Sequence, residues 1–298
     1  MPVERPLLTA RWTELVILSF ALPPEVVARL APRGTVPDLF NGQAYASVIG
    51  FMFRDARLLG LRFPGHSRFE EVNLRFYVGR EADGRLRRGV VFVREIAPRP
   101  LVAAVARCVY NESYVTRPMR SRIEHRNDEL RSFDTRDSAN RHTLLGAGSR
   151  VDYAWRTGGR RQRRWNRIAA RADADAQLPT PGSLEEFIVE HYWAYVRGRD
   201  DATWEYRVAH RPWHVAPATD VVWDCDVAAT YGHSPLAPYL CQPPASAFIA
   251  DGSPVQVFHG HRLEADATTP QPTTRIATPS PRTTVRPRVT AGGIRPPT

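Results

Sequence analysis

The apolar and polar side chains of residues 69–78 alternate with a period of two, which is the pattern of a half-buried β-strand. The polar face of this strand carries Glu71, Asn73, Arg75 and Tyr77. Asp83-Gly84 then turns the chain back into residues 88–96, where apolar side chains fall on both faces. We therefore expect a hairpin whose second strand is central in a sheet.

Turn residues separate further strand-like segments along the chain. Asn41-Gly42 predicts a tight hairpin turn that leads into a strand over residues 43–53. Thr157-Gly158-Gly159 predicts a second hairpin, which joins strands at residues 151–155 and 165–169. Further strands are expected at residues 204–210, 221–228 and 255–262.

Helices are expected at three places between these strands. A short helix begins at Pro24 and is stopped by Pro32, because proline suits a first helical turn and breaks a later one. Residues 101–110 are apolar nearly all round, which favours a buried helix. Ser183 opens a capping box with Glu186, and we expect that helix to continue to about Val196.

These elements predict the fold class and the extent of the domain. Several hairpins, few helices and no regular alternation of strands with helices favour a mainly β (α+β) fold, as an antiparallel β-barrel or split sandwich. We assign this domain to residues 1–265. Residues 266–298 are rich in Thr, Pro and Arg and have almost nothing apolar to bury, so we expect a disordered tail.

The positive charge of the chain is concentrated in two segments. The formal net charge is +10, and all 41 Lys+Arg positions are arginine. Five arginines lie in residues 267–298 and seven between Arg156 and Arg171, and neither of these segments holds an acidic residue. Arginines interleaved with Trp165 are typical of nucleic-acid surfaces, but a solvated hairpin tip is the favoured interpretation, so we do not expect a nucleic-acid partner.

The absence of lysine excludes enzymes that form an imine on a lysine side chain, because a guanidinium does not become a neutral amine. The longest apolar run, residues 15–22, is too short to cross a bilayer, and no secretion signal is recognised. Three widely spaced cysteines favour free thiols in a reducing compartment. We therefore expect a cytoplasmic protein.

No cofactor or metal is expected from the motifs. His259 and His261 share one face of a predicted strand, but no third ligand has a suitable spacing, and each histidine is interpreted as structural. Phosphate-binding, dinucleotide-binding and nucleophile-elbow motifs are absent from the sequence. The oligomeric state is left open by the sequence.

Several segments together carry a family resemblance. They are residues 69–78, 88–96, 110–114, 191–193, 205–213 and 252–255. With these segments in this order, the chain resembles the YqjF-like family of uncharacterised bacterial proteins between residues 8 and 262. That family is similar to the acetoacetate-decarboxylase-like superfamily, so the resemblance implies an antiparallel β-barrel or cone around a small ligand cavity.

The resemblance breaks down at the position of the superfamily's catalytic lysine. In its decarboxylases an Arg-Glu pair is followed by Pro-Lys-Lys, in which the first lysine forms the imine and the second lowers its pKa. Here Arg94-Glu95 matches the pair, but Pro98-Arg99-Pro100 follows. Glu71 stands where the superfamily places a pocket glutamate. The resemblance therefore implies that the pocket persists without the decarboxylase mechanism.

The leading hypothesis is that the chain binds a small organic molecule, with carboxylates among the candidates, in such a pocket. The ligand-binding residues would be Glu71, Arg75 and Arg94, since arginine can hold a carboxylate with two parallel hydrogen bonds. Strand alternation sends Arg94 and Glu95 to opposite faces, so at most one of them should reach the pocket.

Two alternatives remain open at this stage. The first is an acid–base enzyme, such as an isomerase, hydratase or hydrolase, that uses Glu71 or Glu95 as the proton carrier. A minor form of it places an iminium on the amine of Pro2 after removal of Met1. The second alternative is a basic interaction protein that binds an acidic partner through residues 156–171 and the tail.

Overall fold

The structure, a computed structural model, describes a single unit within Met1–Ala265. The described residues are 4–62, 67–100, 113–125, 145–159, 163–198 and 200–263. Three expected features lie wholly or partly outside the described residues: the helix at 101–110, the arginine-rich hairpin tip at 160–162, and the tail at 266–298.

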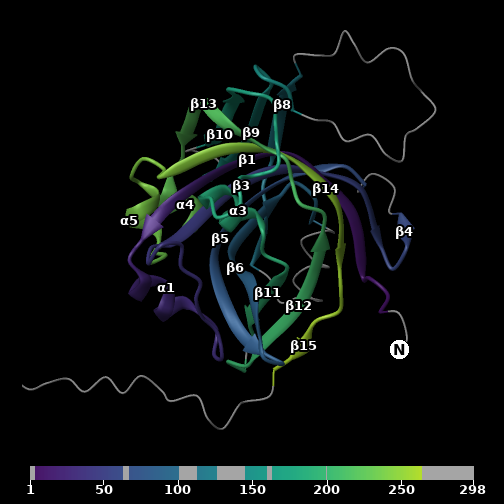
Figure 1. Ribbon diagram of the computed structural model, residues 1–298. Helices are drawn as coiled ribbons and strands as arrows, with labels where there is room; N and C mark the ends of the chain where they lie inside the picture. Colours follow the sequence, from purple (N-terminus) through teal and green to yellow (C-terminus); the bar gives the residue numbers. More distant parts are fainter. Residues whose placement is uncertain are drawn as a thin grey trace, which may run out of the picture. The chain divides into compact units, whose positions relative to one another are not determined.

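Fifteen strands form one continuous sheet in the described part of the chain (Figure 1). The longest are β1 (Leu8–Leu22), β3 (Ala44–Leu58), β5 (Phe69–Ala82), β6 (Arg85–Ala97) and β14 (Ser246–Val257). Those of intermediate length are β8 (Met119–Glu124), β9 (Arg150–Thr157), β10 (Arg164–Ala172), β11 (Trp193–Arg197), β12 (Thr203–His210) and β13 (Val215–Asp224). Short strands are β2 (Val36–Pro37), β4 (Leu61–Arg62), β7 (Tyr114–Thr116) and β15 (His261–Arg262).

Seven of these strands are hydrogen-bonded into a closed ring, in the order β1, β3, β5, β6, β11, β12 and β14. The ring closes where β12 pairs with β14, at Val208↔Val257, and where β14 pairs with β1. Long strands can coil in this way because register shifts let them bend, as in β1 between Thr13 and Val16. This closed ring agrees with the β-barrel or cone expected from the sequence.

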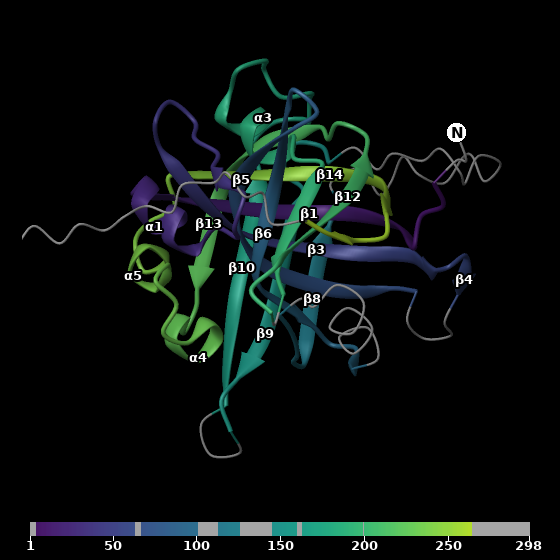
Figure 2. The same cartoon turned by 90° about the horizontal axis from the view of Figure 1, so that it is seen from below.

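A second layer covers one side of the ring. From β14 the sheet continues through β13, β10, β9 and β8, and these strands fold across the outside of β1 and β3 (Figures 1 and 2). Four helices are described, namely α1 (Pro24–Leu30), α3 (Leu184–Val189), α4 (Val227–Tyr231) and α5 (Ala237–Leu240). The longest has seven residues, and none of the described helices is long and apolar enough to span a membrane.

The apolar side chains form two cores, one on each face of the ring strands. The inner core lies inside the ring and includes Phe51, Phe248 and Phe187 of α3. The outer core lies between the ring and the second layer and includes Leu74, Tyr153 and Trp155. Figure 2 shows α3 beside the β5–β6 hairpin, where it contributes its buried face to the inner core.

The alternation predicted for residues 69–78 is confirmed, because the apolar side chains of β5 face the outer core and the polar ones face the ring interior. The two-residue turn at Asn41-Gly42 is also confirmed, with both residues at positive φ and Phe40 bridged to Gln43. The short helix from Pro24 is confirmed and ends at Leu30.

Two expectations about local structure are wrong. The helix that begins after Ser183 ends at Val189 rather than at about Val196, because residues 193–197 form β11 between β6 and β12. Ser183 does cap the helix, with its hydroxyl accepting from the Glu186 amide at 3.2 Å. The strand expected at 221–228 is instead β13, which begins at Val215 and ends at Asp224 before α4. The pairing is mainly antiparallel, as expected, and the exceptions among the described strands are β11 and β7, which run parallel to β6.

Candidate ligand site inside the strand ring

A row of polar side chains from β5 lies in the ring interior. Opposite them on β3 stand Phe51, Ile49 and Ser47, which are also buried. The members of the row are Glu71, Asn73, Arg75 and Tyr77, and each is buried. A buried polar group is energetically unfavourable unless it has a hydrogen-bond partner, so this row is a candidate ligand site.

Arg75 is the cation of this row, and only 7% of it is exposed. Its Nε donates to the Tyr77 hydroxyl at 3.4 Å, and its Nη2 donates to the backbone carbonyl of Ile188 in α3 at 3.1 Å. Its guanidinium carbon also lies 5.5 Å from the centre of the Tyr77 ring. All of these partners are neutral, and in the described part of the chain no carboxylate pairs with Arg75.

Two carboxylates share the interior with Arg75. Glu71 is 2% exposed and accepts hydrogen bonds from the Tyr114 hydroxyl at 2.7 Å and from the Asn73 amide at 3.4 Å. Glu95 is 3% exposed and stands opposite Asn73 in the β5–β6 register. The structure therefore brings Glu71, Arg75 and Glu95 to one face, from two neighbouring strands.

Arg94, by contrast, faces away from that interior. The β5–β6 register shifts between Leu74 and Arg75, which leaves Val93 as an extra residue in β6. Arg94 then pairs opposite Leu74, a residue of the outer core, while Glu95 returns to the interior. The Nε of Arg94 is buried without a hydrogen-bond partner in the described residues. The structure does not bring Arg94 together with Glu71 and Arg75.

A hydroxyl chain extends the polar row toward β1. The Tyr77 hydroxyl donates to the Ser47 Oγ at 2.7 Å, and the Ser47 and Ser19 hydroxyls are 2.8 Å apart. All three side chains are buried. Because each hydroxyl both donates and accepts, this chain fixes the orientation of the Tyr77 oxygen that faces Arg75.

An Asp–His pair beside α3 was not predicted. Asp38 Oδ2 accepts from Arg88 Nε at 2.7 Å and lies 3.0 Å from His191 Nε2. Burial lowers the pKa of His191 to about 4 even though its hydrogen bond with Asp38 opposes the shift, so the ring is neutral at pH 7. Burial would raise the pKa of Asp38, but the bonds from His191 and Arg88 outweigh it and lower the value.

The position of this pair connects it to the polar row. The His191 ring centre lies 4.7 Å from that of Tyr77 and 5.3 Å from that of Phe187. Its Nδ1 is buried without a hydrogen-bond partner in the described residues. The sequence carries no signal for this pair, because Asp38 and His191 are 153 positions apart.

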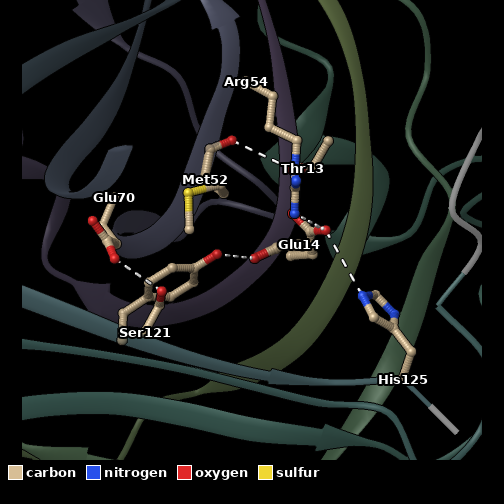
Figure 3. Close-up of polar contacts among 8 residues, drawn as sticks. Thr13, Glu14, Met52, Arg54, Glu70, Ser121 and His125 are labelled. Atoms are coloured by element: carbon tan, nitrogen blue, oxygen red, sulfur yellow. Dashed lines mark hydrogen bonds and ion pairs between the residues drawn. The ribbon is translucent and has the colours of Figure 1, made fainter. Parts of the chain in front are cut away.

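A second buried polar cluster lies outside the ring, where β1 meets the second layer (Figure 3). Glu14 is 4% exposed and has a left-handed backbone, with φ of 52°, at the register shift of β1. Its carboxylate accepts from Arg54 Nη2 at 2.8 Å and from the Thr13 hydroxyl, and it lies 3.8 Å from His125 Nε2. Its backbone carbonyl accepts from the Tyr153 hydroxyl at 2.8 Å.

The Glu14 cluster joins structural elements rather than presenting reactive groups. Burial, with the Glu14 charge adding to it, raises the pKa of Tyr153 well above its usual value, so this hydroxyl stays protonated and donates. Ser121 of β8 donates to Glu70 of β5 at 2.9 Å in the same region. The carboxylate of Glu14 is therefore held by Arg54, and the cluster fixes the second layer against the ring. No group of three or more potential metal ligands occurs among the described residues.

Two comparisons concern the sequence of the chain. A family described as uncharacterised conserved proteins, DUF2071, matches residues 9–254. No curated protein matches the sequence.

Solved structures share the fold at low sequence identity. The enduracididine biosynthesis enzyme MppR, complexed with pyruvate, is 14% identical with a TM-score of 0.54, over 88% of this chain and 92% of that one. An acetoacetate decarboxylase-like enzyme from Sphingomonas wittichii is 10% identical with a TM-score of 0.54, over 86% and 92%. Acetoacetate decarboxylase from Legionella pneumophila is 10% identical with a TM-score of 0.51, over 89% and 92%. These likenesses confirm the fold expected from the sequence.

Proposed function

Because this chain belongs to the DUF2071 family and has the fold of acetoacetate decarboxylase-like enzymes, we propose that it binds a small carboxylate inside the strand ring, at Arg75. The observation that carries this proposal is a guanidinium only 7% exposed whose hydrogen-bond partners in the described residues are neutral oxygens. A buried cation without a counter-ion is unfavourable, and an anionic ligand would supply that counter-ion.

The Arg75 guanidinium retains a donor group for an anionic ligand. Arg75 uses Nε and Nη2 for its protein bonds, and its Nη1 makes no hydrogen bond in the described part of the chain. A planar carboxylate can accept from a guanidinium edge with good geometry. The MppR relative is complexed with pyruvate, which is a keto acid, and this supports the same ligand class here.

Catalysis through an internal imine is excluded for this chain, since no side chain supplies the amine. Arg99 occupies the region where the resemblance places the catalytic lysine, and a guanidinium stays protonated. Binding without decarboxylation is therefore the function that these residues support.

The acid–base alternative extends the same proposal, because Glu71 and Glu95 face the interior with Arg75 and are 2% and 3% exposed. Asn73 lies between Arg75 and Glu71 on the inward row, so a ligand held by Arg75 would have to extend along this row to reach a carboxylate. Glu71, which accepts from the Tyr114 hydroxyl, is the first candidate to take a proton from carbon next to a carbonyl. Deuterium exchange into a bound keto acid, lost in Glu71→Gln, would support this activity.

A thermal-shift panel tests the binding proposal with a matched pair of variants. The panel holds keto acids, hydroxy acids and aromatic carboxylates, with the corresponding amides and phenols as uncharged controls. Arg75→Gln should lose the stabilisation by carboxylates, whereas Arg94→Gln, on the other face of the ring wall, should retain it. Stabilisation by no carboxylate, or an equal loss in both variants, would overturn the proposal.

A further inference from the structure

The second layer has an outward face, which points away from the strand ring. Along β9, Val151, Tyr153 and Trp155 point into the outer core, so the alternate positions point away from the ring. The register of β8, β9, β10 and β13 continues this outward face across the layer. It carries arginines that are all at least partly exposed, namely Arg120, Arg122, Arg150, Arg156, Arg167 and Arg171.

Most of these arginines are neutralised by neighbouring acids. Arg122 pairs with Glu124 at 2.6 Å, and Arg171 pairs with Asp220 at 3.0 Å. Asp152 accepts from Arg167 and lies 3.9 Å from Arg150. Arg120 and Arg156 are different, because neither has a carboxylate partner within the described residues.

The two unpaired arginines meet at a single aromatic ring. The guanidinium carbon of Arg120, on β8, lies 4.3 Å from the centre of the Trp165 ring on β10. That of Arg156, on β9, lies 6.0 Å from the same centre. The indole therefore lies beside two cations whose charge no acid among the described residues balances.

We propose that this outward face binds single-stranded nucleic acid, with Trp165, Arg120 and Arg156 as its centre. Unpaired guanidinium groups would contact phosphates, and a base would stack on the indole or on a guanidinium that rests on it. Among the described residues of this face two cations are unpaired, and they would attract a partner recognised by charge alone only weakly at physiological salt. The aromatic ring between them favours a ligand that combines anionic groups with planar bases.

The sequence alone favoured a solvated hairpin tip for the arginine-rich segment, because Arg156 and Trp165 could not be placed relative to β8. The structure adds Arg120, which lies more than 30 positions earlier in the chain and is stacked on the same indole. This contact unites three strands in one patch. The patch is separate from the ring interior, so it can be tested independently of carboxylate binding.

Fluorescence anisotropy with a labelled oligo(dT) and the full-length chain tests the proposal. Trp165→Ala should weaken binding by about tenfold, the contribution expected for one stacked base. Arg120→Gln/Arg156→Gln should lower the slope of log K against log salt by about 1.4, the value for two phosphate contacts on a single strand. Trp204→Ala on β12, which removes an indole 38% exposed, and Arg171→Gln, which removes an acid-paired arginine, are the matched controls.

The outcomes separate the partner classes. Binding that falls in Trp165→Ala but not in Trp204→Ala, with carboxylate binding unchanged in both, supports the proposal. Equal competition by poly-glutamate would show that the patch recognises charge alone, and would overturn it. The proposal also fails if oligo(dT) does not bind at low salt, or if it binds the parent and Trp165→Ala equally.

Discussion

Removal of the Arg54 guanidinium should destabilise the fold through the buried carboxylate that it leaves behind. Glu14 is 4% exposed, and Arg54 is its cationic partner at 2.8 Å, with Arg54 itself 32% exposed (Figure 3). Breaking a buried ion pair from one side costs about 3–5 kcal/mol. The partial exposure of Arg54 and the remaining Thr13 hydroxyl place the expected loss for Arg54→Met near the lower end, about 3 kcal/mol.

Two companion variants isolate this cause. Glu14→Gln/Arg54→Met removes both charges and should recover most of the loss, because no uncompensated charge remains buried. Arg62→Met breaks a pair with Asp55 in which both side chains are more than half exposed, and it should cost less than about 0.5 kcal/mol. The comparison therefore holds the chemistry constant and changes only the burial.

Urea unfolding at neutral pH, followed by circular dichroism, measures these differences. In thermal unfolding the loss in Arg54→Met corresponds to about 6–12 °C for a domain of this size. The reasoning is refuted if Arg54→Met is no less stable than Arg62→Met. It is refuted as well if the double variant is as unstable as Arg54→Met, since the buried carboxylate would then not be the cause.

Three further predictions concern pH, backbone and chemistry. The pKa of His191 is about 4 in the folded protein and 6.5 in the unfolded chain, so the unfolded state binds the additional proton between these pH values. The free energy of unfolding should therefore fall by about 3 kcal/mol in total as the pH is lowered through this range, and the urea midpoint should change less in His191→Gln. Gly252→Ala should lower the free energy of unfolding by more than about 3 kcal/mol, because the new Cβ would lie 2.0 Å from the Trp12 carbonyl oxygen. Gly60→Ala, which has a similar positive φ but open space around it, should lower it by about 1 kcal/mol in the same urea assay, and equal losses would contradict the steric argument. Treatment with borohydride and acetoacetate should leave no covalent adduct on an internal residue, and Arg99→Lys should not create decarboxylase activity, because the new amine would still lack the second cation that lowers its pKa. Carbon dioxide release by the unmodified chain would contradict this prediction and would indicate catalysis by the N-terminal amine.

The strands could be predicted where the two-residue alternation of polar and apolar side chains is bounded by turn residues. In β5 the polar and apolar positions separate onto the two faces as expected, and the Asn41-Gly42 and Asp83-Gly84 turns both adopt positive φ. The polar face of β5 also placed Glu71 and Arg75 together before the fold was known. These features depend only on neighbouring residues, which is why the sequence contains them.

The sequence could not predict features that depend on distant pairing. A capping box marks where α3 begins but not where it ends, and the residues after Val189 form β11 because β6 and β12 offer open edges. Plain alternation would keep Arg94 on the face of Val90, and the bulge at Val93 moves it to the outer face and brings Glu95 inside. Only the register of β5 against β6 reveals that exchange.

The central claim is that Arg75 holds the carboxylate of a small ligand inside the ring. A crystal structure of the protein soaked with pyruvate, beside one soaked with the uncharged amide, tests it most directly. If Arg75 binds the ligand, we expect carboxylate oxygens within hydrogen-bond distance of its guanidinium in the first crystal, and no bound molecule there in the second. The proposal has no support if neither molecule is seen there. It would be contradicted by pyruvate bound only at another place, or by an Arg75 guanidinium paired with a protein carboxylate in the ligand-free protein.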